Sequence, residues 1–298
     1  MYIPQRIKHK LFFIYIVIVA LAGVVIWTAA ADVGDSLLHL YALNVGQGDA
    51  IYLRLPSGHD LLFDGGPGEG VLSQLGEVMP FNDREIDLVI ATHNHADHIG
   101  GLDDVLDRYE VKEIWLTGAV HDTKTYSNWF KSVKQEEQQG AKVVEVSSGV
   151  TKQFGEITLS TLHPPDDFKG KTPKDQHDAT IVTKVSFRDF DALLTGDLNE
   201  EHEQKILDFQ SQILDSEVMK VPHHGSASGL SEQFLDSVKP KLAIISVGKG
   251  NQFGHPAPSI LRKLREHQVE TYRTDEQGRI ELVSDGERYS AKTEHKPK

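Results

Sequence analysis

The stretch Thr92-His93-Asn94-His95-Ala96-Asp97-His98-Ile99-Gly100-Gly101 follows directly after an apolar segment, residues 86–91, which predicts a buried strand. The six residues from His93 to His98 contain three imidazoles and one carboxylate. The end of a buried strand holds its residues rigidly, and the loop beyond it lets several side chains converge. Imidazole and carboxylate are the ligands expected for zinc, and they also serve manganese or iron. Solvated surface histidines are the alternative, but this density of donors favours a metal site.

Three other places carry further donors. Asp197 ends an apolar strand through Thr195-Gly196, where its carboxylate could bridge two cations, although strand-Gly-Asp is also an ordinary turn. His223 and His224 follow the predicted strand 218–221 and should point in different directions, so one could be a ligand and the other a proton donor or oxyanion partner. His177 precedes a later strand, where a lone loop histidine is often simply solvent-exposed.

The composition limits the possible chemistry. The 298 residues could form one large domain or two small ones, and 39% of them are hydrophobic, which is enough for a sizeable core. The chain has no cysteine, so disulfides, thiolate zinc sites and cysteine nucleophiles are excluded, and any metal must be bound by His, Asp or Glu. The net charge of -13 argues against a basic surface that wraps nucleic acid, but a nuclease can take its local positive field from bound metals.

The N-terminal part differs from the rest of the chain. Residues 1–10 form a basic flank, and residues 11–31 form an apolar run long enough for one transmembrane helix. The basic flank should stay cytoplasmic, which sends the catalytic bulk outside. We favour an anchor over the two alternatives, a signal peptide cleaved near Thr28-Ala29-Ala30-Ala31 and a buried core helix.

Residues 35–285 alternate between strand and helix patterns, which indicates one layered α/β domain without an internal linker. Residues 164–179 are rich in Pro, Asp and Lys and predict a loop, and the polar tail 286–298 is expected to fray. Strands are predicted over residues 37–44, 49–55, 60–63, 86–91, 111–116, 142–146, 157–162, 180–187, 192–195, 218–221, 242–247, 271–273 and 279–283. Helices are predicted over residues 125–139, 199–214, 231–238 and 258–267, with a further one near Leu102–Leu106.

The order of these donors resembles the metallo-β-lactamase superfamily: His-x-His-x-Asp-His after one strand, a His before a later strand, then an Asp and a final His. The resemblance covers residues 37–285 and implies a four-layer αββα sandwich, two mixed sheets between helices, with metals at one edge. Asp64, at the end of an early strand, matches the family's first acidic position, which orients metal ligands from behind.

Five motifs are similar to a narrower group, the extracellular hydrolase domain of ComEC DNA-uptake channels. They are Asn44-Val45-Gly46-Gln47-Gly48-Asp49, Thr195-Gly196-Asp197, Pro222-His223-His224-Gly225-Ser226, Asn251-x-Phe253-Gly254-His255-Pro256 and Arg273-Thr274-Asp275-x-x-Gly278. The chain has at most one membrane helix, whereas such channels have many, so it resembles a stand-alone relative of the soluble domain. The resemblance implies DNA and the DNA-uptake machinery as partners, besides the membrane.

The resemblance also implies two divalent metal ions, Zn or Mn. We expect His93, His95 and His177 to hold the first ion. The identity of the third ligand is left open, because relatives carry an Asn-rich segment at that place and His163 is an alternative to His177. The second ion is expected at Asp97, His98 and one of His223 or His224, with Asp197 as the bridge. Asp97 and Asp197 are therefore the expected catalytic carboxylates, and Asp97 could instead orient the nucleophile or accept its proton.

Several residues near the motifs are candidates for substrate contact: Ser226, Asn251, His255 and Lys220. Each also has an ordinary structural explanation: Lys220 can pack its stem beside the strand, Asn251 can turn the chain, and His255 can cap a loop.

The favoured function is a phosphodiesterase or nuclease that acts on DNA outside the membrane through a metal-activated water. Hydrolysis of a small ester, lactone or thioester is the first alternative, because the same fold supports it. A non-catalytic metal- or DNA-binding protein is the alternative of another class. The lack of an evident basic, aromatic-rich track weakens the nuclease hypothesis.

Overall fold

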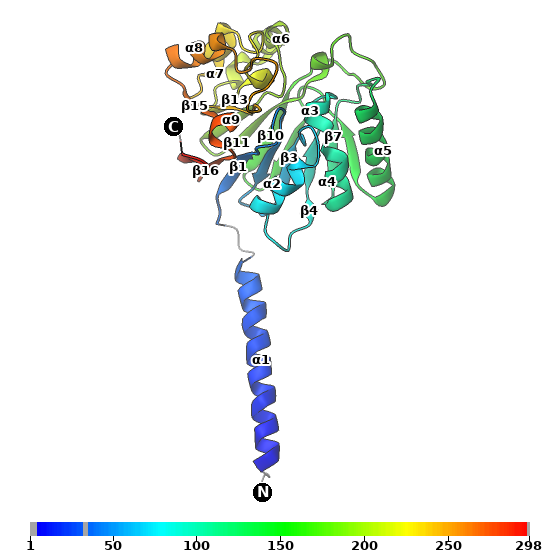
Figure 1. The fold of residues 1–298 in the computed structure, drawn as a ribbon, viewed down its shortest axis with the longest axis vertical. Coiled ribbons are helices and arrows are strands. Elements are labelled where there is room, and N and C mark those ends of the chain that lie inside the picture. The colour runs from blue at the N-terminus through cyan, green and yellow to red at the C-terminus, as the bar shows by residue number, and fades with distance from the viewer. Residues whose placement is uncertain (1–4, 32–34, 297–298) are drawn as a thin grey trace. The chain divides into compact units, whose positions relative to one another are not determined.

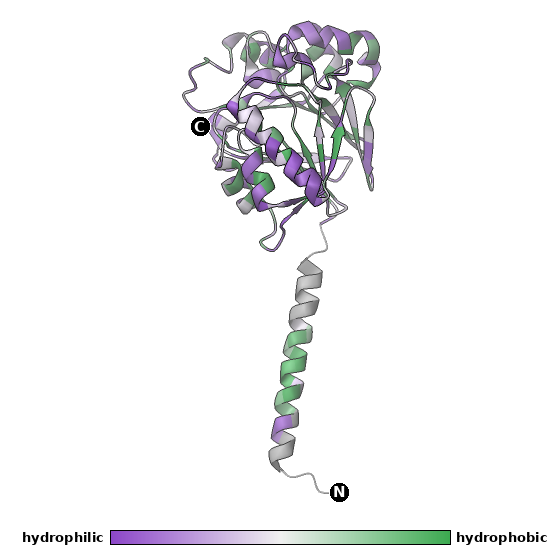
Figure 2. Cartoon of the chain, turned by 90° about the vertical axis from the view of Figure 1, so that its right-hand side faces the viewer, coloured by the Kyte–Doolittle hydropathy of each residue, from purple (hydrophilic) through white to green (hydrophobic). Residues whose placement is uncertain are grey.

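The computed structural model describes residues 5–31 and 35–296 and divides into two units, Met1–Ser36 and Leu37–Lys298. The first unit contains one helix, α1 (Gln5–Ala31), whose described middle part is hydrophobic (Figure 2) and exposes large apolar side chains such as Phe12 and Phe13. Within the described ranges, no helix is both long and apolar enough to cross a membrane, so the predicted transmembrane helix is not confirmed. Residues 1–4 of the predicted basic flank lie outside the described residues.

The second unit contains two large sheets. The first sheet has eight strands in the order β17-β16-β1-β2-β3-β5-β7-β8 (Figure 1). It is antiparallel from β17 to β3 and parallel from β3 to β8. Its strands are β17 (Tyr289–Thr293), β16 (Ile280–Ser284), β1 (Leu38–Ala42), β2 (Ile51–Arg54), β3 (Asp60–Phe63), β5 (Leu88–Ile90), β7 (Glu113–Leu116) and β8 (Lys142–Glu145).

The second sheet has seven strands in the order β15-β14-β13-β12-β11-β10-β9. It is antiparallel from β9 to β12 and parallel from β12 to β15. Its strands are β15 (Glu270–Arg273), β14 (Leu242–Ile245), β13 (Val218–Lys220), β12 (Phe190–Leu194), β11 (Val182–Phe187), β10 (Ile157–His163) and β9 (Thr151–Phe154). A small separate sheet pairs β4 (Glu85–Ile86) with β6 (Glu110–Val111).

Helices cover the outer face of each large sheet (Figure 1). On the first sheet they are α2 (Gly70–Val78), α3 (Ala96–Ile99), α4 (Leu102–Arg108) and α5 (Lys124–Gln139), and on the second they are α6 (Glu200–Gln210), α7 (Glu232–Val238) and α8 (Pro258–Glu266). Short helical turns complete the domain: η1 (Gln176–Ala179), η2 (Ser211–Ile213), η3 (Pro222–Gly225) and α9 (Thr274–Gln277).

Three hydrophobic cores separate these layers. Successive strand residues point to opposite faces, so Leu61 and Phe63 of β3 enter the core between the sheets while Leu62 enters the core under the helices. The third core packs the second sheet against α6, α7 and α8, and it contains Met219 of β13 and Phe234 of α7. Strands buried on both faces are continuously apolar, as expected for a sheet covered on both sides. The domain is therefore the four-layer αββα sandwich predicted from the sequence.

The prediction that the tail 286–298 frays was wrong for residues 289–293, while residues 297–298 lie outside the described residues. Residues 289–293 form the edge strand β17, paired with β16 through registers such as Leu282 with Ala291. Tyr289 and Ala291 pack against the core between the sheets while the intervening residues face outward, and this alternation is what forms the strand. Helix α2 and strand β9 were not predicted from the sequence, and the predicted loop 164–179 ends in the turn η1.

Candidate metal centre

The predicted donors lie where strands of both sheets end. Asp64 follows β3, the histidine cluster follows β5, Asp197 follows β12, and His223 with His224 follows β13. Because parallel strands within a sheet end at the same edge, and the two sheets pack face to face, these loops converge.

The first cluster consists of His93, His95 and His177. One ring nitrogen of each lies within 4.8 Å of the others, and His93 Nε2 is 3.0 Å from His95 Nδ1. Burial lowers the pKa of His93 well below its usual value and that of His95 to about 4, so both are neutral at pH 7, which is the form that binds metal. The structure thus places His177 with the two histidines that the sequence paired.

A capping box positions His177. The side chain of Asp175 accepts from the backbone N–H of His177, and Asp178 reaches back to the N–H of Asp175. Asp175 Oδ1 is also 2.7 Å from His177 Nδ1, which leaves Nε2 directed at the cluster, 4.0 Å from Asp197.

The rival ligand His163 belongs elsewhere. Its buried Nδ1 donates to the carbonyl of Thr180 at 2.7 Å, its ring lies against His202, and burial lowers its pKa to about 3. Within residues 5–31 and 35–296, His163 joins none of the potential ligand groups.

The second cluster consists of Asp97, His98, Asp197 and His224, with one donor atom of each within 4.8 Å of the others. Nε2 of His98 is 3.3 Å from Asp197 Oδ1, and Nε2 of His224 is 3.3 Å from Asp97 Oδ2 and 3.4 Å from Asp197 Oδ2. His98, Asp197 and His224 are buried, whereas the Asp97 side chain is 33% exposed. Solvent therefore reaches the second cluster at Asp97.

Asp197 lies between the two clusters. It also groups with His177 and His223, since its Oδ2 is 3.7 Å from His223 Nε2 and 4.0 Å from His177 Nε2. Its carboxylate therefore faces donors of both clusters, which is the arrangement expected of a bridging ligand.

The donor set fits metal ions on physical grounds. Four buried polar atoms that face this space have no hydrogen-bond partner among the described residues: His98 Nε2, His177 Nε2, Asp197 Oδ1 and His224 Nε2. An unsatisfied buried polar atom costs about 1–3 kcal/mol. Divalent cations coordinated by these nitrogens and oxygens would remove that cost.

Backbone geometry directs His223 and His224 into the centre. Both adopt left-handed conformations, with φ of 47° and 53°. Such angles are uncommon for residues other than glycine and cost about 1–3 kcal/mol each, and they concentrate at functional sites. The two rings diverge as the sequence predicted: His224 joins the second cluster, while His223 lies beside His177 with 24% of its side chain exposed.

Gly48 holds the histidine loop from the other side. Its φ is +140°, and a Cβ there would lie 2.1 Å from the backbone oxygen of Asp97. The next residue, Asp49, donates its N–H to that same oxygen at 3.1 Å. Only glycine permits this approach.

Asp64 supports the donors from behind, as the resemblance implied. Its Oδ2 accepts from His98 Nδ1 at 2.8 Å, and it also accepts from the N–H and hydroxyl of Thr92 at 2.8 and 2.6 Å. This bond fixes the His98 ring so that Nε2 faces Asp197. Burial alone would lower the pKa of His98, but Asp197 and Asp64 outweigh it and raise that pKa well above its usual value in the metal-free protein.

A buried ion pair of Asp49 and Lys220 lies beneath the second cluster. The Lys220 ammonium contacts Asp49, donates to the carbonyl of Gly196 at 2.6 Å, and lies 3.5 Å from Asp197 Oδ1. Asp49 Oδ1 in turn is 3.3 Å from His224 Nδ1. The suggestion that Lys220 contacts substrate was wrong, because its side chain is only 2% exposed. Sequence reasoning missed Asp49, although it closes the quoted Gly46-Gln47-Gly48-Asp49 motif.

The other predicted substrate residues lie around the centre. Asn251 uses its side chain within its own loop, donating to the carbonyls of Gly248 and His255, so we assign it to loop structure rather than to substrate contact. His255 is partly exposed, with its ring 5.9 Å from that of His223. Ser226 is partly exposed and pairs with Ser228 at 3.3 Å.

His121 was not predicted as a site residue, although its ring is 6.0 Å from that of His95. The only sequence signal for it is its position a few residues beyond the carboxyl end of β7, the neighbour of β5 in the sheet.

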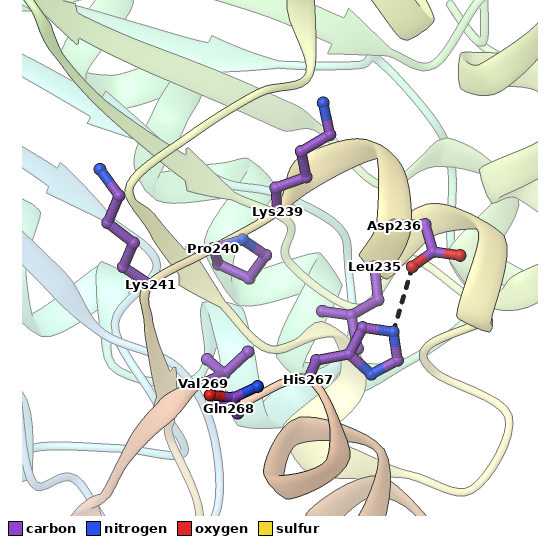
Figure 3. A pocket seen from close by; sticks show the side chains of 8 residues that line it. All are labelled: Leu235, Asp236, Lys239, Pro240, Lys241, His267, Gln268 and Val269. Carbon is purple, nitrogen blue, oxygen red and sulfur yellow. Dashed lines mark hydrogen bonds and ion pairs between the residues drawn. The ribbon is translucent and has the colours of Figure 1, made fainter.

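One cavity lies away from this centre. A cavity of about 370 Å³ lies between α7 and the segments that precede β14 and β15 (Figure 3), where His267 bonds Asp236 at 3.1 Å. It lies at the amino ends of these strands, whereas active sites of open parallel sheets lie at the carboxyl ends. We therefore place the functional site at the histidine clusters.

Comparisons with known proteins agree with this geometry. A family model described as the metallo-beta-lactamase superfamily matches residues 43–249. ComE operon protein 3 of Bacillus subtilis is 30% identical over 260 residues, which cover 80% of this chain and 32% of that protein. Competence protein ComA of Neisseria gonorrhoeae is 26% identical over 242 residues, covering 80% of this chain and 31% of that protein. The chain thus spans about a third of the length of these curated relatives.

Solved structures show the same fold. Zn(2+)-bound PqqB from Methylobacterium extorquens superimposes with a TM-score of 0.51 at 10% identity, covering 79% of this chain and 97% of that chain. The metallo-beta-lactamase fold protein YhfI from Bacillus subtilis gives a TM-score of 0.50 at 12% identity, covering 79% of this chain and 95% of that chain. At such identities the likeness shows the fold alone. The family model, the sandwich and the converging histidines lead to one conclusion: this chain belongs to the metallo-β-lactamase superfamily of metallo-hydrolases.

Proposed function

We propose that this chain is a two-metal phosphodiesterase that cleaves DNA. The observation that carries the proposal is the position of Asp197 between the two donor clusters, because a shared carboxylate holds two cations close together. Paired cations a few ångströms apart are typical of enzymes that cleave phosphate esters. The motifs similar to those of DNA-uptake hydrolase domains, and a relative named as a competence protein, favour DNA over a small ester.

The residues divide into three tasks. His93, His95 and His177 would hold the first ion, and Asp97, His98 and His224 the second, with Asp197 between them. Bound divalent cations, Zn or Mn, supply an activated water and neutralise the negative charge that develops on a phosphoryl oxygen. Asp64 and the Asp49–Lys220 pair keep these donors in place.

Asp97 is the most exposed donor of the second cluster. Burial raises its pKa, but the His224 imidazole 3.3 Å away and the charge of His98 outweigh burial and lower it to about 2, so it is ionised at neutral pH. As a carboxylate it can bind the second ion or take the proton of the attacking water. The metal content of Asp97→Asn separates these roles: two retained ions with lost activity indicate the proton acceptor, and one ion indicates the ligand.

The direct test uses residues 33–298, prepared without metal and then loaded with Mn or Zn. Single-stranded DNA, double-stranded DNA and bis-p-nitrophenyl phosphate are offered as substrates, with Asp97→Asn and Asp197→Asn as controls. We expect metal-dependent DNA cleavage that both substitutions abolish. Turnover of the small diester without DNA cleavage would contradict the DNA assignment and indicate a small-molecule hydrolase.

The cellular setting that we propose is DNA uptake, with the catalytic domain outside the membrane. It rests on the competence relatives and on the apolar run at residues 11–31, which would serve as the anchor. Mass spectrometry of the native protein tests the anchor. An N-terminus near residue 32 would contradict it and indicate a cleaved signal peptide.

A further inference from the structure

The loop beside the metal centre carries two neighbouring rings, those of Phe253 and His255, which we call the aromatic step. The ring of Phe253 stacks on His255, with centroids 5.9 Å apart and planes 18° apart. The ring of His255 is 5.9 Å from that of His223, which lies 3.7 Å from Asp197. A continuous series of rings therefore leads from the shared carboxylate to solvent.

Phe253 is exposed, but hydrogen bonds hold the loop that carries it. Its side chain is 58% exposed, although an apolar ring of this size gains free energy when it is buried. The loop is nonetheless fixed, because Asn251 accepts from the N–H of Phe253 at 3.1 Å and of His255 at 3.0 Å. The same amide donates to the carbonyl of His255 at 2.7 Å.

The loop is also tied to the turn between β1 and β2 of the first sheet. The N–H of Gly248 donates to Gln47 Oε1 at 3.1 Å, and a Cβ on Gly248 would lie 2.6 Å from the Gln47 backbone nitrogen. The aromatic step is thus held at a set place relative to Asp49 and the histidine loop.

Other exposed phenylalanines lack this position. Among the described residues of the second unit, Phe81 is 92% exposed, Phe209 76% and Phe130 42%. The ring of Phe130 contacts Tyr126, and no described ring contact joins Phe81 or Phe209 to the donor histidines. Phe253 alone of these four is linked by ring contacts to the metal centre.

We infer that Phe253, backed by His255, is a stacking platform for an unpaired nucleobase whose neighbouring phosphodiester lies at the metal centre. This inference rests on the proposed function and names its substrate class as single-stranded nucleic acid. Stacking suits a rigid, exposed ring because every nucleobase has a flat apolar face, and a platform of this kind accepts any sequence. A duplex, with its bases already stacked on one another, would not use it.

The test compares three substrates with the metal-loaded chain: an oligothymidylate strand, an all-abasic strand of equal length, and methyl p-nitrophenyl phosphate. The wild-type chain is expected to cleave the base-bearing strand with about tenfold higher kcat/KM than the abasic strand, the size of one stacking contact. Phe253→Leu should remove that preference while leaving turnover of the small diester unchanged. Phe253→Trp should keep the preference.

Phe81→Leu is the matched control, because Phe81 is also exposed but makes no described ring contact with the donor histidines, so the change should leave all three rates unchanged. Equal losses on all three substrates for Phe253→Leu, or no loss on the base-bearing strand, would overturn the inference while leaving the phosphodiesterase proposal standing. A wild-type chain that cleaves the small diester but neither strand would overturn both the DNA assignment and the platform.

Discussion

The buried pair beneath the second cluster gives the sharpest prediction about stability. Lys220→Met replaces a buried ammonium by an apolar side chain of similar length, while Asp49 stays in place. The substitution removes the contact with Asp49 and the hydrogen bond to the carbonyl of Gly196. Burial alone would lower the pKa of Lys220, but Asp49 and Asp197 raise it above its usual value, so the side chain is charged at pH 7.

The expected cost follows from what remains around Asp49. Breaking a buried ion pair by removing one partner costs about 3–5 kcal/mol. Asp49 keeps His224 at 3.3 Å and His98 at 3.9 Å, so we expect the lower end, about 3 kcal/mol, in the metal-free protein. For a domain of this size that corresponds to a fall in Tm of about 6–12 °C.

Thermal and urea unfolding of the metal-free chain measure this cost. The double variant Lys220→Met with Asp49→Asn should recover at least about 1 kcal/mol relative to Lys220→Met, because the unpaired buried charge is gone. Lys241→Met is the control: that lysine is 69% exposed and pairs with Glu217 at 3.3 Å, so the change should cost less than about 1 kcal/mol. The reasoning is refuted if Lys220→Met unfolds like the wild type or if the double variant is less stable than Lys220→Met.

Three further predictions follow from the same contacts. Asp64→Asn keeps a residue type that tolerates the observed φ of 60° but places an amide donor opposite His98 Nδ1. Metal affinity, measured by chelator competition, should therefore fall about 10- to 100-fold. An unchanged affinity would count against the supporting role of Asp64. His98 and His224 carry raised pKa values in the metal-free chain, because the carboxylates beside them outweigh burial. Metal loading at pH 7 should therefore release up to about two protons, measured with a pH indicator in weak buffer, and metal affinity should weaken as the pH falls. Loading without proton release would contradict this prediction. Burial raises the pKa of Glu203 to about 7 despite the hydrogen bond from Ser231, so between about pH 4.5 and 7 the folded state keeps a proton that the unfolded state has lost. The free energy of unfolding should therefore decrease by up to about 3 kcal/mol as the pH rises through that window. Glu203→Gln should flatten this decrease in urea titrations, whereas parallel curves for the two proteins would show that Glu203 is not its source.

Local sequence predicted the fold layers and most of the donor positions. The apolar strands and the run from His93 to His98 are each contained in a short segment, so pattern alone revealed them. Whether His177 or His163 meets this run depends on the conformation of the loop before β11. The capping box at Asp175 sets the position of His177 in that loop.

What the sequence could not predict depends on contacts between distant segments. Asp49 and Lys220 are paired across the two sheets, and nothing near either residue specifies that partner. Asn251 resembled a substrate contact because its motif did, but whether an amide faces its own loop is decided by backbone geometry. The tail was misjudged because its polar residues alternate with two that pack inward, a pattern too short to distinguish from a frayed end.

The central claim is a centre of two cations that share Asp197. The most direct measurement is the metal content of the purified chain after loading with Mn, combined with electron paramagnetic resonance of the bound ions. The account predicts two ions per chain with magnetic coupling between them, and Asp197→Asn should lose the coupling or one ion. A single ion per chain, or two ions without coupling in the wild type, would contradict it.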